Sequence, residues 1–381
     1  MRSWSDEEYG MANTNTLLVI GNGFDLYLGR KTSYKDYFLS DDFKEKREQL
    51  LSIYRNRVKT LTHNWVDSMT CWDILFWGIS CIESNQIESV EDYKWCDIEM
   101  IIRDSLIRTS GKRSFDWISG IRKINNINRG GILDNTSDIY REELYRTIYS
   151  YFMYKKWMDD NKDDLYERLY EELLIFERQF GNYIKNQTSG MEYEYAARAL
   201  IDNLKNDDRI CMIDSFNYSE PCKDIYSLRH INGDYNNPIF GINMLYEEQI
   251  NNSQICLFTK TSRRLRQDAK EISNLADIRS QTQKKVIVFG HSLNEQDFDY
   301  FSYIFTKLRF NTFDIEQMGQ IEFVYSIYDE NRKIEIANSN ADAVYRILEK
   351  YESIVSNTNQ HVLINLLRFS GKLRIREISN G

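Results

Sequence analysis

Four short segments of this sequence are rich in glycine, asparagine, histidine, serine and aspartate, the residue types that bind and process polar ligands. The first segment consists of Gly21, Asn22, Gly23, Phe24 and Asp25. A glycine turn after an apolar strand lets the backbone approach a phosphate, and the following helix directs its free N–H groups at the anion. Because Gly29 stands at the wrong spacing for the dinucleotide fingerprint, the turn alone is equally typical of a structural strand–turn–helix unit. We expect Asn22 and Asp25 to be exposed, and Phe24 and Leu26 to anchor the turn.

The other three segments also follow apolar runs. They are residues 214–218 (DSFNY), residues 230–234 (HINGD), and residues 290–293 (GHSL) with Asp297. In an open sheet of parallel strands, a ligand lies outside the carboxyl ends of the strands. Any one of these segments is ordinary turn chemistry, because asparagine, aspartate, glycine and serine dominate turns. Four of them together favour one shared site.

The elements that position these segments are visible in the apolar pattern. Strand-like runs occur at residues 16–20, 209–213, 224–231, 238–242, 285–289 and 321–327. Several are uniformly apolar, which is typical of parallel strands covered on both faces. Residues from about 40 to 205 have helical spacing instead, and a helix is also expected at 263–275. The clearest helical stripe consists of Leu165, Leu169, Leu173, Phe176, Phe180 and Tyr183. The charged residues expected to face water beside it are Glu167, Arg168, Glu171, Glu172 and Arg178.

The first strand finds possible partners only after residue 205, so we predict one α/β parallel sheet with a large helical insertion after the first strand–helix unit. The alternative is two separate domains, one helical and one mixed. The expected parts are a tail or expression scar at 1–12, a sheet core at 13–40 and 206–330, the insertion at 41–205, and a C-terminal helical and strand segment packed on the core at 331–381.

Composition limits the class of protein. The 381 residues carry 49 Lys and Arg against 58 Asp and Glu, a formal net charge of −9, which disfavours a nucleic-acid partner. A hydrophobic content of 42% excludes a disordered chain. No apolar run reaches the roughly 18–20 residues that span a bilayer, and the start lacks the features of a secretory signal. The six cysteines and four histidines show no zinc-ligand spacing. We therefore expect a reduced, cytoplasmic protein with no membrane partner and no metal.

Residues 17–38, LLVIGNGFDLYLGRKTSYKDYF, resemble the opening motif of the AbiH family of bacterial phage abortive-infection proteins. Three later segments resemble further motifs of that family in the same order: FNYS at 216–219, INGDYNNPIFGI at 231–242 and FGHSLNEQDFDYF at 289–301. Residues 95–99, WCDIE, resemble the W-x-D-x-E element of the family. The resemblance implies an antiviral effector that acts in abortive infection.

The AbiH pattern in turn resembles the sirtuin-like superfamily of NAD-binding and NAD-cleaving domains, which implies a Rossmann-like nucleotide-binding core and NAD⁺ as substrate or ligand. The residues implied to bind NAD⁺ are Gly21, Asn22, Gly23, Phe24, Asp25, Asn232, Gly233, Gly290, His291, Ser292 and Asp297. The resemblance implies that Asn217 lies near the nicotinamide ribose. With His230 and Asp234, whose side chains could act as bases, it forms the set of candidate catalytic residues.

One departure concerns the catalytic histidine. The sirtuin-like pattern has His-Gly where this chain has Asn232-Gly233. His230 lies two residues upstream, and residues i and i+2 of a strand share a face, so His230 is a candidate base at near-neutral pH. It is equally a structural strand histidine, in which case the catalytic position is lost. Asp234 and Asp25 are alternative bases.

We therefore expect an NAD⁺ glycohydrolase that cleaves the nicotinamide–ribose bond. One alternative is a catalytically inactive nucleotide-binding sensor. Another is a metal-dependent nuclease or RNA-acting effector in which Asp97, Glu99 and Asp25 hold Mg²⁺. The expected partners are a nucleotide, a phage-derived trigger or partner protein, and further copies of the chain in a homo-oligomer.

Overall fold

The computed structural model describes residues 15–56, 69–83, 98–106, 147–148, 151, 162–206, 208–242, 255–268, 285–356 and 362–378. Residue contacts divide the chain into two compact units. The sheet unit comprises the described residues within 1–30, 188–231 and 273–381, and the helical unit comprises those within 31–187 and 232–272. Within this part of the chain, no helix combines the length and the apolar character needed to cross a membrane.

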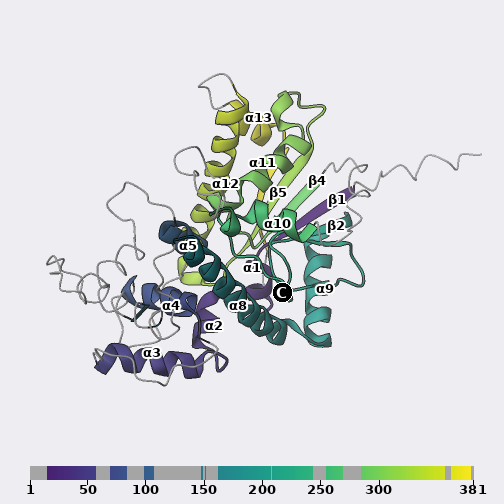
Figure 1. Ribbon diagram of the computed structural model, residues 1–381. Coiled ribbons are helices and arrows are strands. Elements are labelled where there is room, and N and C mark those ends of the chain that lie inside the picture. The colour runs from purple at the N-terminus through teal and green to yellow at the C-terminus, as the bar shows by residue number, and fades with distance from the viewer. Residues whose placement is uncertain are drawn as a thin grey trace, which may run out of the picture. The chain divides into compact units, whose positions relative to one another are not determined.

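The sheet unit is built on parallel strands. They are β1 (Asn15–Ile20), β2 (Arg209–Ser215), β3 (Leu228–His230), β4 (Lys285–Phe289), β5 (Gln320–Ser326) and β6 (Leu373–Ile378). Their spatial order, β3-β2-β1-β4-β5-β6, is that of doubly wound Rossmann-type sheets. Figure 1 labels four of these strands, β2, β1, β4 and β5. The predicted parallel α/β sheet, in which the first strand pairs with strands from beyond residue 205, is confirmed.

Two predicted strands are shorter or missing. The run 224–231 contributes only β3, because turns occupy residues 221–226. The run 238–242 forms no strand, and only Ile242 makes an isolated bridge, to Thr259. Pro238 has no N–H to donate to a sheet, and the Phe240 N–H donates to the Glu177 carboxylate at 2.7 Å instead of to a strand. Apolar residues at 238–242 therefore reflect burial within the helical unit.

Strand register places three loops at one edge of the sheet. Ile20 at the end of β1 is level with Ser215 of β2 and with Phe289 of β4. The chain therefore leaves all three strands at the same level, as residues 21–25, 216–219 and 290–293. The strand order reverses between β1 and β4, and ligands of open α/β sheets bind at such a reversal.

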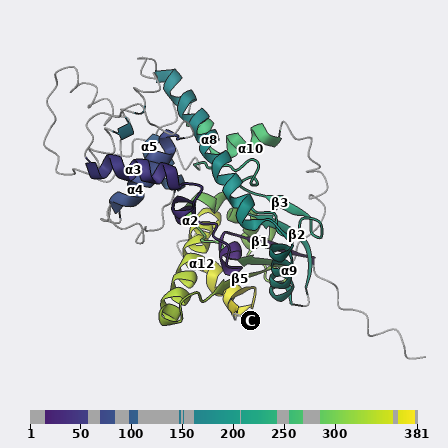
Figure 2. The ribbon, with the colours of Figure 1, turned by 90° about the horizontal axis from the view of Figure 1, so that it is seen from below.

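Both faces of the sheet are covered. Leu17 and Val19 point to one face, where they pack in a core with residues of α11 (Phe298–Lys307), α12 (Lys333–Val355) and α13 (Val362–Phe369). Leu18 and Ile20 point to the other face and pack with residues of α9 (Met191–Lys205). Figure 2 shows α12 and α9 on opposite sides of the strands. Burial on both faces explains why β1 is apolar at four successive positions, Leu17–Ile20.

The helical unit has a core rich in aromatic side chains. Its helices include α2 (Tyr34–Leu39), α3 (Lys44–Asn56), α4 (Cys71–Glu83), α5 (Ile98–Leu106), α8 (Lys162–Thr188) and α10 (Lys260–Asp268). The predicted stripe on α8 is confirmed by the burial of Leu169, Leu173, Phe176, Phe180 and Tyr183. The side chain of Leu165 lies outside the described residues.

The prediction that Glu172 faces water is wrong. Its side chain accepts hydrogen bonds from the Tyr151 hydroxyl at 2.5 Å and from the Cys71 N–H, at the start of α4, at 2.6 Å. The first N–H groups of a helix have no partner inside the helix, so a buried carboxylate is stabilised there. Glu177 on the same helix is also buried, paired with Arg263 of α10. Residue type alone assigns a glutamate to the surface, whereas these two have partners that are distant in the sequence.

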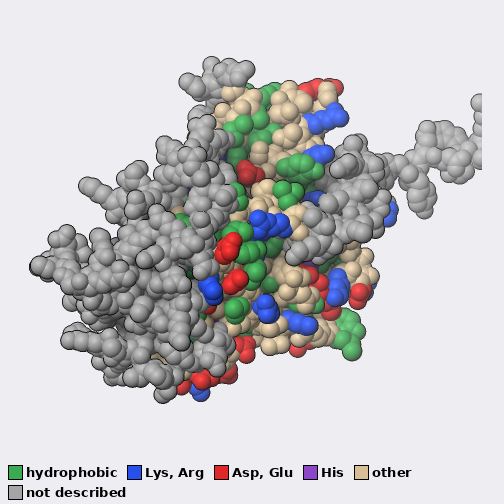
Figure 3. Space-filling model, in the orientation of Figure 1, with side chains coloured by type: hydrophobic (Ala, Val, Ile, Leu, Met, Phe, Trp, Pro, Cys, Tyr) green, Lys and Arg blue, Asp and Glu red, His purple; other side chains and the backbone are tan. Residues whose placement is uncertain are grey.

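Charges of both signs are mixed on the described surface that Figure 3 shows, where Lys and Arg side chains alternate with Asp and Glu. The expectation that the protein has no nucleic-acid partner stays a prediction.

Candidate functional site

The glycine turn after β1 packs directly against the loop after β4. The Gly23 N–H donates to the Gly290 carbonyl at 2.8 Å, and the Gly21 N–H donates to the Phe289 carbonyl at 3.0 Å. A Cβ atom on Gly23 would lie 2.6 Å from the Gly290 Cα. Gly290 itself has φ +67°, a conformation that favours glycine. The turn after β1 and the loop after β4 touch through their backbones, where the strand order reverses. This close approach requires glycine at positions 23 and 290.

This contact bears on the expected phosphate cradle. The N–H groups of Gly21, Gly23 and Phe24 all donate to backbone carbonyls of the protein. The helix that follows, α1 (Gly23–Tyr27), is only 5 residues long, so its dipole is weak. The side chain of Asn22 is exposed, as predicted. The role of the turn in binding NAD⁺ stays a prediction.

Replacing Gly23 by alanine is expected to destabilise the protein by about 2 kcal/mol, because the methyl group meets backbone that cannot rotate away. Gly29→Ala is the comparison: Gly29 has φ +72° and open space around it, so only the backbone conformation should cost about 1 kcal/mol. Urea unfolding of both variants checks the difference. Equal losses would show that the contact with Gly290 tolerates a side chain.

Asp25 is buried, and the prediction that it is exposed is wrong. Its side chain is 1% exposed, whereas Leu26, which was expected to anchor the turn, is 45% exposed. The reason is that α1 begins at Gly23 and turns Phe24 and Asp25 together toward the interior. The buried side chain at this point of the turn is therefore that of Asp25 and not that of Leu26.

Three side chains donate hydrogen bonds to the Asp25 carboxylate. The Tyr193 hydroxyl donates to Oδ1 at 2.6 Å. The Ser219 hydroxyl and the Asn217 amide donate to Oδ2 at 2.7 Å and 3.1 Å. Burial raises the pKa of Asp25 from 3.8 to about 6, against the opposing effects of these hydrogen bonds and of the Arg30 charge. A carboxyl group with this pKa changes its charge just below neutral pH, as acid–base groups in enzymes do.

Asn217 has a buried acceptor atom without a partner. The residue is 4% exposed, and its Oδ1 atom has no hydrogen-bond partner among the described residues. A buried polar atom left unpaired costs roughly 1–3 kcal/mol, so such atoms are rare and often belong to functional sites. The other end of the amide donates to Asp25, so the acceptor end is the one available to a ligand.

His230 and His291, near the loop at residues 216–219, make contacts that suit opposite neutral tautomers. The His230 Nδ1 atom lies 3.3 Å from the backbone carbonyl oxygen of Asn217. A carbonyl can only accept, so this contact requires a proton on Nδ1 and leaves the lone pair on Nε2. The His291 Nδ1 atom instead accepts from the Leu293 N–H at 2.9 Å, so its proton lies on Nε2, 3.4 Å from the Asp297 carboxylate. In a neutral His230 ring this contact puts the lone pair on Nε2, the arrangement that a base requires, whereas the contacts of His291 suit a donor at Nε2.

His291 is packed into the sheet unit. Its side chain is 4% exposed, and its ring centroid lies 4.3 Å from that of Phe216 and 5.0 Å from that of Phe301. Together with Asp297 it fixes the loop after β4, whereas Ser292 in the same loop is exposed. Contact of these three residues with a nucleotide stays a prediction.

The expected site residues 232–234 belong to the helical unit. The Asn232 Oδ1 atom accepts from the Arg264 guanidinium at 2.7 Å, and the Asp234 carboxylate accepts from the N–H groups of residues 236 and 237. Gly233 has φ +79°. His230 and Asn232 do not share a strand face as predicted, because β3 ends at His230. The roles of residues 232–234 toward NAD⁺ stay predictions.

The alternative of a magnesium site finds no supporting cluster. Among the described residues, no three His, Cys, Asp or Glu side chains gather closely enough to hold a metal ion. Glu99 forms an ion pair with Lys260 at 2.8 Å, and Asp25 is held by the three donors described above. Asp97 lies outside the described residues.

Sequence reasoning missed Tyr193 and Ser219 as neighbours of Asp25. Ser219 ends the FNYS segment that carried the family resemblance, so the signal was present. Tyr193 lies on α9 among alternating acidic and aromatic residues, and 168 positions separate it from Asp25. Nothing in its local sequence distinguishes it from Tyr195, which is 71% exposed on the same helix.

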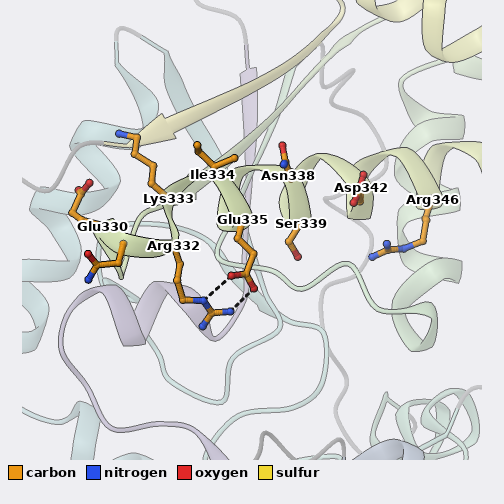
Figure 4. Close-up of a pocket in the computed structure, with 10 residues that line it drawn as sticks. Glu330, Arg332, Lys333, Ile334, Glu335, Asn338, Ser339, Asp342 and Arg346 are labelled. Carbon is orange, nitrogen blue, oxygen red and sulfur yellow. Dashed lines mark hydrogen bonds and ion pairs between the residues drawn. The ribbon is translucent and has the colours of Figure 1, made fainter.

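A surface hollow in the sheet unit lies elsewhere. In the described part of the chain it is lined only by residues of the 3₁₀ turn Glu330–Arg332 and of α12, as Figure 4 shows. The Arg332 guanidinium there is paired with Glu335 at 2.5 Å, and both side chains are at least half exposed. Since the hollow runs along one helix and its drawn charges are solvated, we assign no ligand to it.

One comparison with known proteins is informative. A family model described as "Bacteriophage abortive infection AbiH" matches residues 17–317 of the 381 residues. The matched range includes the glycine turn, the loop with Asn217 and Ser219, α9 with Tyr193, and the loop after β4. A search of curated proteins gave no match. Because the family model matches well over half of the chain and spans the whole buried network around Asp25, the chain belongs to the AbiH family of bacteriophage abortive-infection proteins.

Proposed function

We propose that this protein carries out its role in abortive infection by hydrolysing NAD⁺ at the nicotinamide–ribose bond. The phage-defence role follows from membership of the AbiH family. The proposal extends to a cytoplasmic location, to control by a phage-derived trigger, and to a homo-oligomeric form. An enzyme that depletes NAD⁺ must be inactive until infection, so a trigger is a necessary part of the proposal.

The observation that carries the proposal is the buried, unpaired Oδ1 atom of Asn217 at the carboxyl end of β2. It lies in the loop next to β1, on the edge of a Rossmann-ordered sheet where ligands bind. A ribose offers hydroxyl donors that suit such an acceptor. A hydrogen bond from a ribose hydroxyl would give the Oδ1 atom of Asn217 the partner that it lacks among the described residues.

The chemistry requires positioning more than a strong nucleophile. The bond between nicotinamide and the ribose breaks with its electron pair on nicotinamide, which leaves as a neutral molecule, while positive charge develops on the ribose. Water then adds to the ribose and loses a proton, giving ADP-ribose. In this proposal Asn217 holds the ribose, and the Nε2 lone pair of His230 accepts the proton of the water. Asp234 and Asp25 are further candidates for that base.

The test is to incubate the purified full-length protein with NAD⁺, with and without extract of phage-infected cells, and to measure nicotinamide by chromatography. We expect release that is lost in Asn217→Ala and retained in Asn338→Ala, a matched change on the exposed surface of α12. Absence of release under both conditions, or equal release by Asn217→Ala, would exclude the activity. A rise in melting temperature with intact NAD⁺ would identify a nucleotide-binding sensor instead.

A further inference from the structure

The side-chain amide of Asn217 has a donor end and an acceptor end, and which end meets a ligand depends on what holds the other. We propose that Asp25 is a positioning residue that fixes the orientation of the Asn217 amide, so that Oδ1 accepts a hydrogen bond from a hydroxyl group of the bound ligand. The inference rests on the proposed function only for the identity of that ligand as a ribose.

The orientation follows from the chemistry of the partners. An ionised carboxylate has only acceptors, so the amide end that faces Asp25 must be Nδ2. The Oδ1 atom then points away from Asp25 and is the buried atom without a partner among the described residues. If Asp25 were neutral, it would gain a donor, and the opposite amide orientation would become possible. The charge of Asp25 therefore selects which end of Asn217 is offered.

Asp25 is itself held from two directions. The Tyr193 hydroxyl on α9 donates to Oδ1, and the Ser219 hydroxyl donates to Oδ2 beside the Asn217 amide. All three of these hydrogen bonds come from side chains, so the carboxylate does not serve to cap a helix or to close a turn. The Asp25 carboxylate links α9, through Tyr193, and the loop of Ser219 to the side-chain amide of Asn217. Supporting residues fix the orientation of functional groups in this way.

Other charged groups lie close to this network. The Arg30 guanidinium lies over the Tyr193 ring, 5.7 Å from its centroid, and pairs with Glu192 at 3.4 Å. Glu194 raises the pKa of Tyr193 further, beyond the effects of burial and Asp25, so the phenol stays protonated and acts as a donor. His230 contacts the backbone of Asn217 and not its amide. Tyr193 is therefore a fixed donor, and Asp25 is the member of the network whose charge varies.

The test uses the full-length protein labelled with ¹⁵N-asparagine and needs no ligand. The side-chain NH₂ signals of Asn217 are identified by their loss in Asn217→Ala. In Asp25→Asn we expect these signals to shift and their hydrogen exchange to become about tenfold faster, because the bond to a charged acceptor is lost. Ser219→Ala, which keeps the carboxylate, is expected to give a smaller shift in the same direction. Unchanged Asn217 signals in Asp25→Asn would overturn the inference.

Matched controls and a kinetic measurement complete the test. Asp299→Asn on the exposed surface of α11 and Tyr195→Phe on α9 are expected to leave the Asn217 signals in place. If NAD⁺ is cleaved, Asp25→Asn is expected to lower kcat about 100-fold with a smaller change in KM, since a misoriented acceptor fails at the reacting ribose. If NAD⁺ is not cleaved but the signals depend on Asp25, the positioning role stands and the proposed activity fails. A kcat equal to that of the wild type would overturn the role.

Discussion

Asp25→Asn is expected to make the protein more stable at pH 8 by roughly 3 kcal/mol while removing most of its activity. The pKa of Asp25 is about 6 in the folded protein, against an ordinary value of 3.8, and burial is the main cause. The folded state therefore binds this proton more tightly than the unfolded chain does. Stability from Asp25 is present below about pH 4, falls as the pH rises toward 6, and above that is lower by a constant amount of roughly 3 kcal/mol.

An asparagine at position 25 avoids this loss because it does not titrate. Its oxygen can accept from the Tyr193 hydroxyl, and its NH₂ group can donate to the Ser219 hydroxyl and to the Asn217 amide oxygen once that amide has turned over. Urea unfolding between pH 5 and pH 8 should show the wild type losing stability relative to Asp25→Asn, with Asp299→Asn following the wild type. If Asp25→Asn is less stable than the wild type at pH 8, the carboxylate is structural. A stable but inactive variant is the signature of a functional group that the fold retains at a cost.

Asn217→Ala is expected to reduce nicotinamide release by roughly 10²–10³-fold, the usual effect of removing one hydrogen-bonding group that acts in the transition state. Its effect on stability should be small, about 1 kcal/mol, because the amide makes one hydrogen bond to Asp25 and its Oδ1 has no partner among the described residues. The measurement is kcat and KM for NAD⁺ alongside a urea unfolding curve.

A second variant tests whether the amide group of Asn217 is needed, apart from the size of the side chain. Asn217→Asp keeps the size of the side chain but places a second carboxyl group next to Asp25, about 3 Å away. Two such groups cannot both ionise readily, so this variant should lose activity and be less stable at pH 8 than at pH 5. A variant that retains the activity of the wild type would show that the donor end of Asn217 is not needed. A loss of activity that tracks a loss of folding in both variants would assign Asn217 a structural role.

The strands and the helix stripes follow from local pattern because burial is periodic. The run 285–289 is apolar after Lys285, and it forms β4 with those bounds. The stripe on α8 recurs every three or four residues and is buried as expected. The predictions from pattern were wrong for two acidic residues, Glu172 and Asp25, which were expected to be exposed. Both are buried, with hydrogen-bond partners from other parts of the chain. The pattern failed also at 238–242, where apolar residues are buried without pairing in a sheet.

The sequence alone was sufficient for the family, the parallel sheet and the loops that carry Gly23, Asn217 and Gly290, because each of these is encoded in residues that are neighbours along the chain. Tertiary structure alone placed Tyr193 on Asp25, left the Asn217 Oδ1 atom without a partner among the described residues, and decided which groups contact the Nδ1 atoms of His230 and His291. Hydrogen-bond partners and desolvation depend on which distant groups fold against a side chain. A carboxylate therefore has the same sequence signature whether it is solvated or buried.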